Sequence, residues 1–128
     1  MDLSEWIERY RRAWEQADDE AVGALFTEGA TYRSNPFREP YVGRDAIRTY
    51  WRQATASQEN VRVAFGEPVV QGRRVAVEWW TQMTDEGETL RLVGALILHF
   101  DENGFCDALR EYYNVVEGEG LPPEGWGR

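Results

Sequence analysis

Residues 88–116 contain two runs rich in Leu, Ile, Val and Tyr, and residues 101–104, which end in Asn-Gly, separate them. Asn-Gly between two such runs is a strong hairpin signal, so the pattern predicts one long antiparallel hairpin. Both faces of its first arm are apolar, with leucines on one face and Val93, Ala95 and Ile97 on the other. One face can pack against a core inside the subunit, and the other should be buried against another protein surface.

The second arm of this hairpin brings a carboxylate onto an apolar face. Because side chains alternate between the two faces of a strand, Glu111 shares a face with Leu109 and Tyr113. The alternating run before the hairpin gathers large side chains in the same way. Its common face carries Val75, Val77, Trp79, Thr81 and Met83.

Apolar residues in the first half of the chain recur at helical spacing, which predicts helices over residues 2–17, from residue 18 to Gly29, and after Gly43. A short strand at residues 30–34 is expected between the second and third helices, because Asn35-Pro36 then breaks the pattern. Four strands follow, the first starting near residue 61 and turning at Gln71-Gly72. This order predicts an α+β fold with the helices on one face of a curved sheet.

Composition narrows the classes of function. The 128 residues fit one domain, and the net charge of −9 disfavours nucleic-acid binding. All fourteen cationic side chains are Arg, which excludes lysine Schiff-base chemistry. With His99 and Cys106 the only residues of their types, we expect no internal disulfide, no metal and no other cofactor. No apolar run resembles a signal peptide or a membrane span, so we expect a cytoplasmic protein without a membrane partner.

Several short runs, taken together and in order, resemble the nuclear transport factor 2-like superfamily. They are Glu8-Arg9-Tyr10 through Ala17-Asp18, Ala24-Leu25-Phe26 with Gly29-Ala30-Thr31, Gly43 through Tyr50, and His99-Phe100 with Asn103-Gly104. The superfamily includes ketosteroid isomerases, limonene epoxide hydrolases and SnoaL-like polyketide cyclases. The resemblance implies a strongly curved antiparallel sheet wrapped around three N-terminal helices, cone-shaped with an internal cavity. It assigns residues 1–117 to this domain and leaves 118–128 as a Gly- and Pro-rich tail, but it specifies no activity.

The ketosteroid isomerase residues are mostly replaced. Tyr10 matches the tyrosine that donates to the oxyanion in those enzymes. Asn35 stands in place of their general-base aspartate and cannot accept a proton at neutral pH. Leu98 stands in place of their second donor, a protonated aspartate. The resemblance therefore does not imply ketosteroid isomerisation.

One carboxylate remains from the similarity to epoxide hydrolases. Their Arg and Asp, two residues apart on one strand, are replaced by Trp79 and Thr81. Their second carboxylate, in a run like Arg-Asp-Tyr, has a counterpart in Arg110-Glu111-Tyr112. Glu111 is thus the one acidic group that the resemblance places in the cavity.

The resemblance and the strand alternation agree on which side chains point inward. Together they predict an aromatic-lined pocket for a small, largely apolar organic molecule. Its expected ligand-binding residues are Trp14, Tyr32, Asn35, Phe37, Trp51, Trp79, Thr81, Met83, Leu96, Leu98, Leu109 and Tyr113.

The remaining sheet residues form an outward face that is unusually apolar. We expect it to join two copies of the chain in a homodimer. Its residues are Glu78, Trp80, Val93, Ala95, Ile97 and Tyr112. The tail is expected to be mobile, with packing of Trp126 onto the subunit as the alternative.

Glu111 and Tyr10 are the candidate catalytic residues. An apolar cavity raises the pKa of a carboxyl toward neutrality, where Glu111 can serve as an acid or a base. With Tyr10 and Tyr32 as donors, this predicts an isomerase, cyclase or hydratase without a cofactor. In the alternative, Glu111 is structural, paired with Arg33 or hydrogen-bonded to one of these tyrosines. The protein is then a non-catalytic binding or dimerisation module of the same fold.

Overall fold

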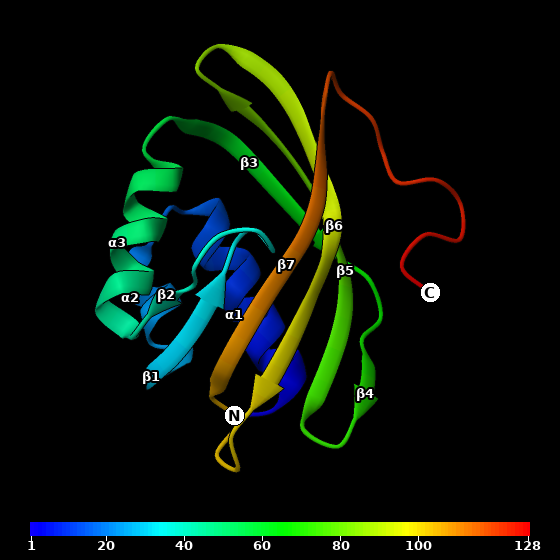
Figure 1. Cartoon of the computed structure of the whole chain (residues 1–128). Helices are drawn as coiled ribbons and strands as arrows, with labels where there is room; N and C mark the ends of the chain where they lie inside the picture. The colour runs from blue at the N-terminus through cyan, green and yellow to red at the C-terminus, as the bar shows by residue number, and fades with distance from the viewer.

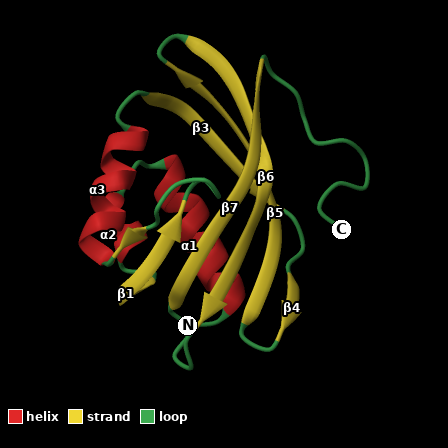
Figure 2. Cartoon of the chain, viewed as in Figure 1, coloured by secondary structure: helices red, strands yellow, loops and turns green.

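The computed structural model describes residues 1–128 and places three helices against the concave face of a seven-stranded sheet (Figures 1 and 2). The helices are α1 (Leu3–Glu15), α2 (Asp19–Gly23) and α3 (Arg44–Thr55). The strands are β1 (Phe26–Arg33), β2 (Tyr41–Val42), β3 (Gln58–Phe65), β4 (Val69–Gln71), β5 (Arg74–Asp85), β6 (Glu88–Phe100) and β7 (Cys106–Glu117). The predicted α+β fold class is confirmed. None of the helices is long and apolar enough to cross a membrane.

The sheet has the strand order β2-β1-β7-β6-β5-β3, and β4 pairs with β5 outside this path. Every pair is antiparallel except β1 and β7, which run parallel. The sheet is therefore mixed, whereas the resemblance implied an antiparallel sheet. The alternation within single strands does not report the direction in which two strands pair. The long strands β5, β6 and β7 bend together, and the helices lie on the concave side of this bend (Figure 1).

The predicted hairpin is present as β6 and β7. Its turn is organised by Asp101, whose Oδ1 accepts hydrogen bonds from two backbone N–H groups of the turn. Gly104 adopts a φ of +87°, which glycine reaches without a steric penalty. In the register Leu96 lies opposite Glu111 and Leu98 opposite Leu109, so these four side chains share the concave face.

Helix α1 supplies the large side chains that fill this concave face. Asp2 caps it by accepting a hydrogen bond from the backbone N–H of Glu5. Its buried residues are Trp6, Tyr10, Ala13 and Trp14. The indole N–H of Trp6 donates to the carbonyl of Leu25 at 2.9 Å, which satisfies the one polar group of that side chain in the core.

Two predicted boundaries were wrong. Helix α2 ends at Gly23, and the chain enters β1 at Phe26, because Phe26 pairs with Cys106 at the start of the parallel ladder. The strand that begins the second half also stops early, at Phe65. Pro68 cannot donate to a sheet ladder, so the chain breaks there and resumes as the separate strand β4.

The C-terminal tail packs on the convex face of the sheet. The Trp126 ring meets the Trp80 ring edge to face at 5.9 Å, and the Trp80 indole N–H donates to the carbonyl of Gly120. Gln82 accepts from the backbone N–H of Gly120, and Arg91 donates to the carbonyl of Gly118. The structure therefore shows the alternative in which Trp126 packs on the subunit, and the tail covers part of the predicted dimer face.

Candidate active site between the helices and the sheet

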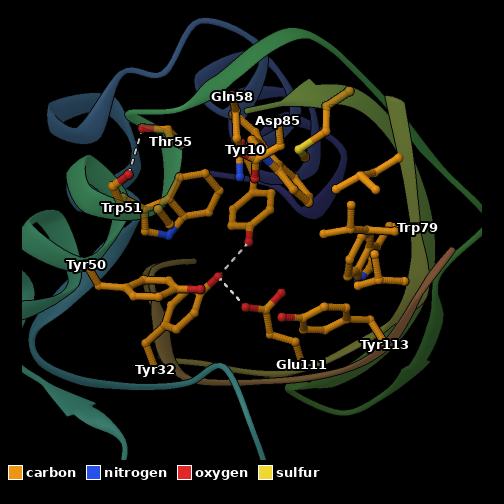
Figure 3. Close-up of a pocket in the computed structure, with 16 residues that line it drawn as sticks. Tyr10, Tyr32, Tyr50, Trp51, Thr55, Gln58, Trp79, Asp85, Glu111 and Tyr113 are labelled. Carbon is orange, nitrogen blue, oxygen red and sulfur yellow. Dashed lines mark hydrogen bonds between the residues drawn. The ribbon is translucent and has the colours of Figure 1, made fainter. Parts of the chain in front are cut away.

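A cavity of about 270 Å³ lies between helices α1 and α3 and the concave face of the sheet (Figure 3). Sixteen residues line it, and twelve of them are hydrophobic. They are Tyr10, Trp14, Tyr32, Tyr50, Trp51, Ala54, Thr55, Gln58, Trp79, Met83, Asp85, Leu90, Leu92, Glu111, Tyr113 and Val115. Helices and strands both contribute, so the cavity exists only when the two layers are packed.

The structure brings eight of the sequence-predicted site residues together around this cavity. They are Tyr10, Trp14, Tyr32, Trp51, Trp79, Met83, Glu111 and Tyr113. Four other predicted residues lie in the core but do not line the cavity, namely Thr81, Leu96, Leu98 and Leu109. Their strand phase was predicted correctly, but they lie deeper in the packing, where neighbouring side chains cover them.

Asn35 and Phe37 lie away from the cavity. Both belong to the exposed loop that connects β1 to β2, and the side chain of Phe37 is 95% exposed. The Asn35 side chain accepts a hydrogen bond from the backbone N–H of Phe37, which is the ordinary role of Asn in a turn. The expectation that these two residues border the cavity is wrong.

Sequence reasoning missed eight lining residues. They are Tyr50, Ala54, Thr55, Gln58, Asp85, Leu90, Leu92 and Val115. A signal was present for three of them, because Leu90 and Leu92 share the phase of Leu96, and Val115 shares that of Glu111. How far along these strands the cavity extends depends on the placement of α3, which strand phase does not report.

Glu111 lies at the wall of the cavity with only 7% of its surface exposed. The hydroxyl of Tyr32 donates to its Oε1 at 3.0 Å, and the hydroxyl of Tyr10 lies 3.1 Å from that of Tyr32 (Figure 3). Because the Tyr32 hydroxyl donates its proton to Glu111, the Tyr10 hydroxyl is the donor in its hydrogen bond with Tyr32. The second carboxylate oxygen of Glu111, Oε2, has no hydrogen-bond partner in the chain.

The surroundings of Glu111 disfavour the ionised form of its carboxyl group. Desolvation raises its pKa from an ordinary value of 4.5 to about 7, and the hydrogen bond from Tyr32 opposes this rise. Burial, and then the charge of Glu111, raise the pKa of Tyr10 and of Tyr32 well above the usual value. The tyrosines therefore stay protonated as donors, while Glu111 exchanges its proton near neutral pH.

The arginine partner expected for a structural Glu111 is not observed. Arg33 donates to the backbone carbonyl of Arg38, and no arginine lines the cavity. The hydrogen bond from Tyr32, which a structural role would also produce, is observed. Glu111 thus uses Oε1 for a structural hydrogen bond and leaves Oε2 free for a ligand. Because its pKa is near neutral, the carboxyl can donate a proton to a ligand at Oε2 or accept one from it. No group of three His, Cys, Asp or Glu side chains is arranged to hold a metal ion.

Three solved structures illustrate the similarity of this fold to known proteins. An epoxide hydrolase/cyclase-like enzyme, SalBIII, described in pyran ring formation in the polyether salinomycin, has a TM-score of 0.79 and 21% identity over 90% of this chain and 95% of its own. A hypothetical protein from Catenulispora acidiphila with a ketosteroid isomerase-like fold, in complex with trimethylamine, has a TM-score of 0.77 and 22% identity over 85% of each chain. RV0760c from Mycobacterium tuberculosis has a TM-score of 0.75 and 16% identity over 88% of this chain and 93% of its own.

At these identities the structural likenesses establish the fold alone. A comparison with curated proteins gives no match. The model of the SnoaL-like domain matches residues 7–106, which is most of the chain and includes most of α1, all of α2 and α3, and strands β1 to β6. The chain therefore belongs to the SnoaL-like domain family, within the nuclear transport factor 2-like superfamily.

Proposed function

We propose that the protein binds a small, largely apolar organic molecule in the cavity and transforms it by acid/base catalysis without a cofactor. The observation that carries this proposal is Glu111, a carboxyl buried among aromatic side chains, with a pKa of about 7 and one oxygen without a partner in the chain. A carboxyl in these surroundings is poised to exchange a proton with a bound molecule.

A single exchanging carboxyl favours reactions that consume and release no net proton. Glu111 can take a proton from one position of a bound molecule and return it at another, as isomerisation, ring closure and hydration each require. When Glu111 is ionised, Tyr32 donates its proton to the carboxylate and Tyr10 donates to the Tyr32 hydroxyl, which stabilises the carboxylate as the starting form. We therefore assign Glu111 as the general base that becomes the acid in the second half of the reaction.

Ring closure of an epoxy alcohol is the member of this class that we favour. Ionised Glu111 accepts the hydroxyl proton while the hydroxyl oxygen forms a bond to an epoxide carbon. The epoxide C–O bond breaks, and the resulting alkoxide takes the proton back from Glu111. The structural neighbour described in pyran ring formation supports this choice among the three reaction types.

The test uses 4,5-epoxypentan-1-ol as a probe and gas chromatography to follow its conversion to tetrahydrofurfuryl alcohol. The wild-type chain is expected to accelerate ring closure, and kcat/KM is expected to rise with pH through about 7 as Glu111 ionises. Glu111→Gln should abolish the acceleration. Unchanged turnover in this variant would remove Glu111 from the mechanism, and no turnover by the wild-type chain would leave binding without this chemistry.

We also propose that two copies of the chain associate through the part of the convex face that the tail leaves free. Val93, Ala95 and Ile97 form an apolar strip along β6, and Tyr112 beside them on β7 is 45% exposed. Burial of these apolar side chains against a second copy would remove them from water. The tail, which lies on Trp80, limits how far such a contact can spread.

A further inference from the structure

The ionisable carboxyl groups that line the cavity have no cationic side chain beside them. Two carboxylates, Glu111 and Asp85, are among its lining residues, and none of the fourteen arginines of the chain is. The chain has no lysine that could compensate them. A bound molecule therefore meets negative charge without a cationic side chain beside it.

The uncharged walls of the cavity add to this effect. Three tryptophans and four tyrosines line it. Several of these rings pack edge to face, as where Trp14 meets Trp51 at 5.6 Å and 90°, and Trp79 at 5.2 Å and 66°. The face of an aromatic ring carries partial negative charge and attracts cations, most strongly for tryptophan.

Glu111 completes the arrangement. It is more than nine-tenths buried, and its Oε2 has no partner in the chain. An ionised carboxylate in such a place is stabilised by a positive charge on the ligand more than by any neutral group. The lining thus has the composition of a site for an organic cation.

We propose that the molecule taken by the cavity carries a substituted ammonium group, which lies among the aromatic rings and is balanced by Glu111. This inference rests on the proposed binding function of the same cavity and names its ligand class. The hydrocarbon part of the ligand contacts the apolar residues Leu90, Leu92 and Val115.

A cation and a neutral molecule of the same shape respond oppositely to pH. A cation binds the ionised form of Glu111, so its affinity rises as pH passes through the pKa of that carboxyl. A neutral molecule removes water from Glu111 and favours the protonated form, so its affinity falls over the same range. The sign of the pH dependence therefore separates the two ligand classes.

The cavity holds other titratable groups besides Glu111. Asp85, at the end of β5, is the second carboxyl of the lining. The groups around Glu111 are the hydroxyls of Tyr10 on α1, Tyr32 on β1, Tyr50 on α3 and Tyr113 on β7, and burial raises the pKa of each. Strand β6 places the apolar Leu96 opposite Glu111. All four hydroxyls stay neutral between pH 6 and pH 8, so they add no change of charge in that range.

The test measures binding of choline and of 3,3-dimethylbutan-1-ol, its neutral analogue of the same shape, by titration calorimetry at pH 6 and pH 8. Choline is expected to bind about tenfold more tightly at pH 8 than at pH 6, because the ionised fraction of a group with a pKa near 7 changes by that factor. The neutral analogue should bind more weakly than choline at pH 8, and more weakly at pH 8 than at pH 6.

Glu111→Gln is expected to remove both the pH dependence and the preference for choline. Glu102→Gln is the matched control, because it removes the same charge from the exposed β6–β7 turn, outside the cavity, and should change neither. If Glu111→Gln does not fold by circular dichroism, the opposite signs expected of the two probes on the wild-type chain still decide the question.

Equal or tighter binding of the neutral analogue at pH 8 would overturn the ammonium inference and leave the proposed binding function standing. Failure of both probes to bind, together with failure of the epoxy alcohol to react, would overturn the inference and the proposed function. Preference for choline that survives in Glu111→Gln would place the cation elsewhere and would also overturn the inference.

Discussion

The hydroxyl of Tyr32 lies 3.0 Å from Oε1 of Glu111, and this hydrogen bond is the one favourable polar contact that the carboxylate makes with the chain. Desolvation raises the pKa of Glu111, and the bond from Tyr32 lowers it. The near-neutral pKa is the balance of these two effects. Changes at Tyr32 should therefore move it without altering the charge of the chain.

Replacing Tyr32 by Phe is expected to raise the pKa of Glu111 above about 7 by roughly one unit, because a hydrogen bond to a charged group contributes about 1.5 kcal/mol. Carbon NMR of chain labelled at glutamate measures the titration directly. Tyr10→Phe is the matched comparison and should give a smaller shift, since Tyr10 acts through Tyr32. An unchanged pKa in Tyr32→Phe would show that the bond does not stabilise the carboxylate.

The ionisation of Glu111 should make the fold less stable as pH rises. Its pKa is raised on folding, so the folded chain holds a proton that the unfolded chain releases between about pH 4.5 and pH 7. Stability is greatest below this range and falls through it, and the pKa difference corresponds to about 3 kcal/mol. Urea unfolding of the wild type and of Glu111→Gln at pH 4.5 and pH 8 measures it. Parallel pH profiles for the two chains would contradict this prediction.

Removing the tail after Glu117 should expose Trp80 and enlarge the apolar part of the convex face. We expect the shortened chain to form more dimer than the full chain at equal concentration, as measured by size exclusion with light scattering. Trp126→Ala is the matched control, because it removes the ring that meets Trp80 but keeps the tail's hydrogen bonds to the sheet. A shortened chain that stays entirely monomeric would argue against association through this face.

Gly94 should not tolerate a side chain. A Cβ built there overlaps the backbone oxygen of Tyr112 and lies 2.6 Å from the Cβ of Tyr113. Gly94→Ala is therefore expected to lower the free energy of unfolding by roughly 1–3 kcal/mol through overpacking. Gly29→Ala, at a strand position where a Cβ meets nothing within 4 Å, is the control for the change of residue type. Equal stability of the two variants would show that β6 and β7 shift to make room.

Strand phase was the most informative signal in the sequence. It grouped Trp79 with Met83 on one strand and Glu111 with Tyr113 on another, and the resemblance turned both groups inward. The paired register and the burial of these side chains confirm that they share the concave face. The helix pattern did the same for Tyr10 and Trp14. These predictions succeeded because each depends on the period of a single element and not on how elements pack.

Other features depend on contacts between elements that are distant in sequence. The parallel pairing of β1 with β7 and the depth of the cavity along β6 and β7 both depend on how the layers meet. Phe37 illustrates the limit, because it was expected to bind the ligand, whereas the loop turns its ring into solvent. The composition of the tail left two alternatives, a mobile tail and a tail that packs on the subunit through Trp126. The contact between the Trp126 and Trp80 rings shows the second.

The Tyr32–Glu111 bond joins the first long strand of the chain to the last, across 79 positions of sequence. Neither partner can be positioned while the other is missing, so a nascent chain on the ribosome has no working site until nearly all of it has emerged. Closing so long a loop is slow compared with forming the helices. The chemistry of the protein should therefore be among the last properties gained in folding and among the first lost when either end of the sheet frays.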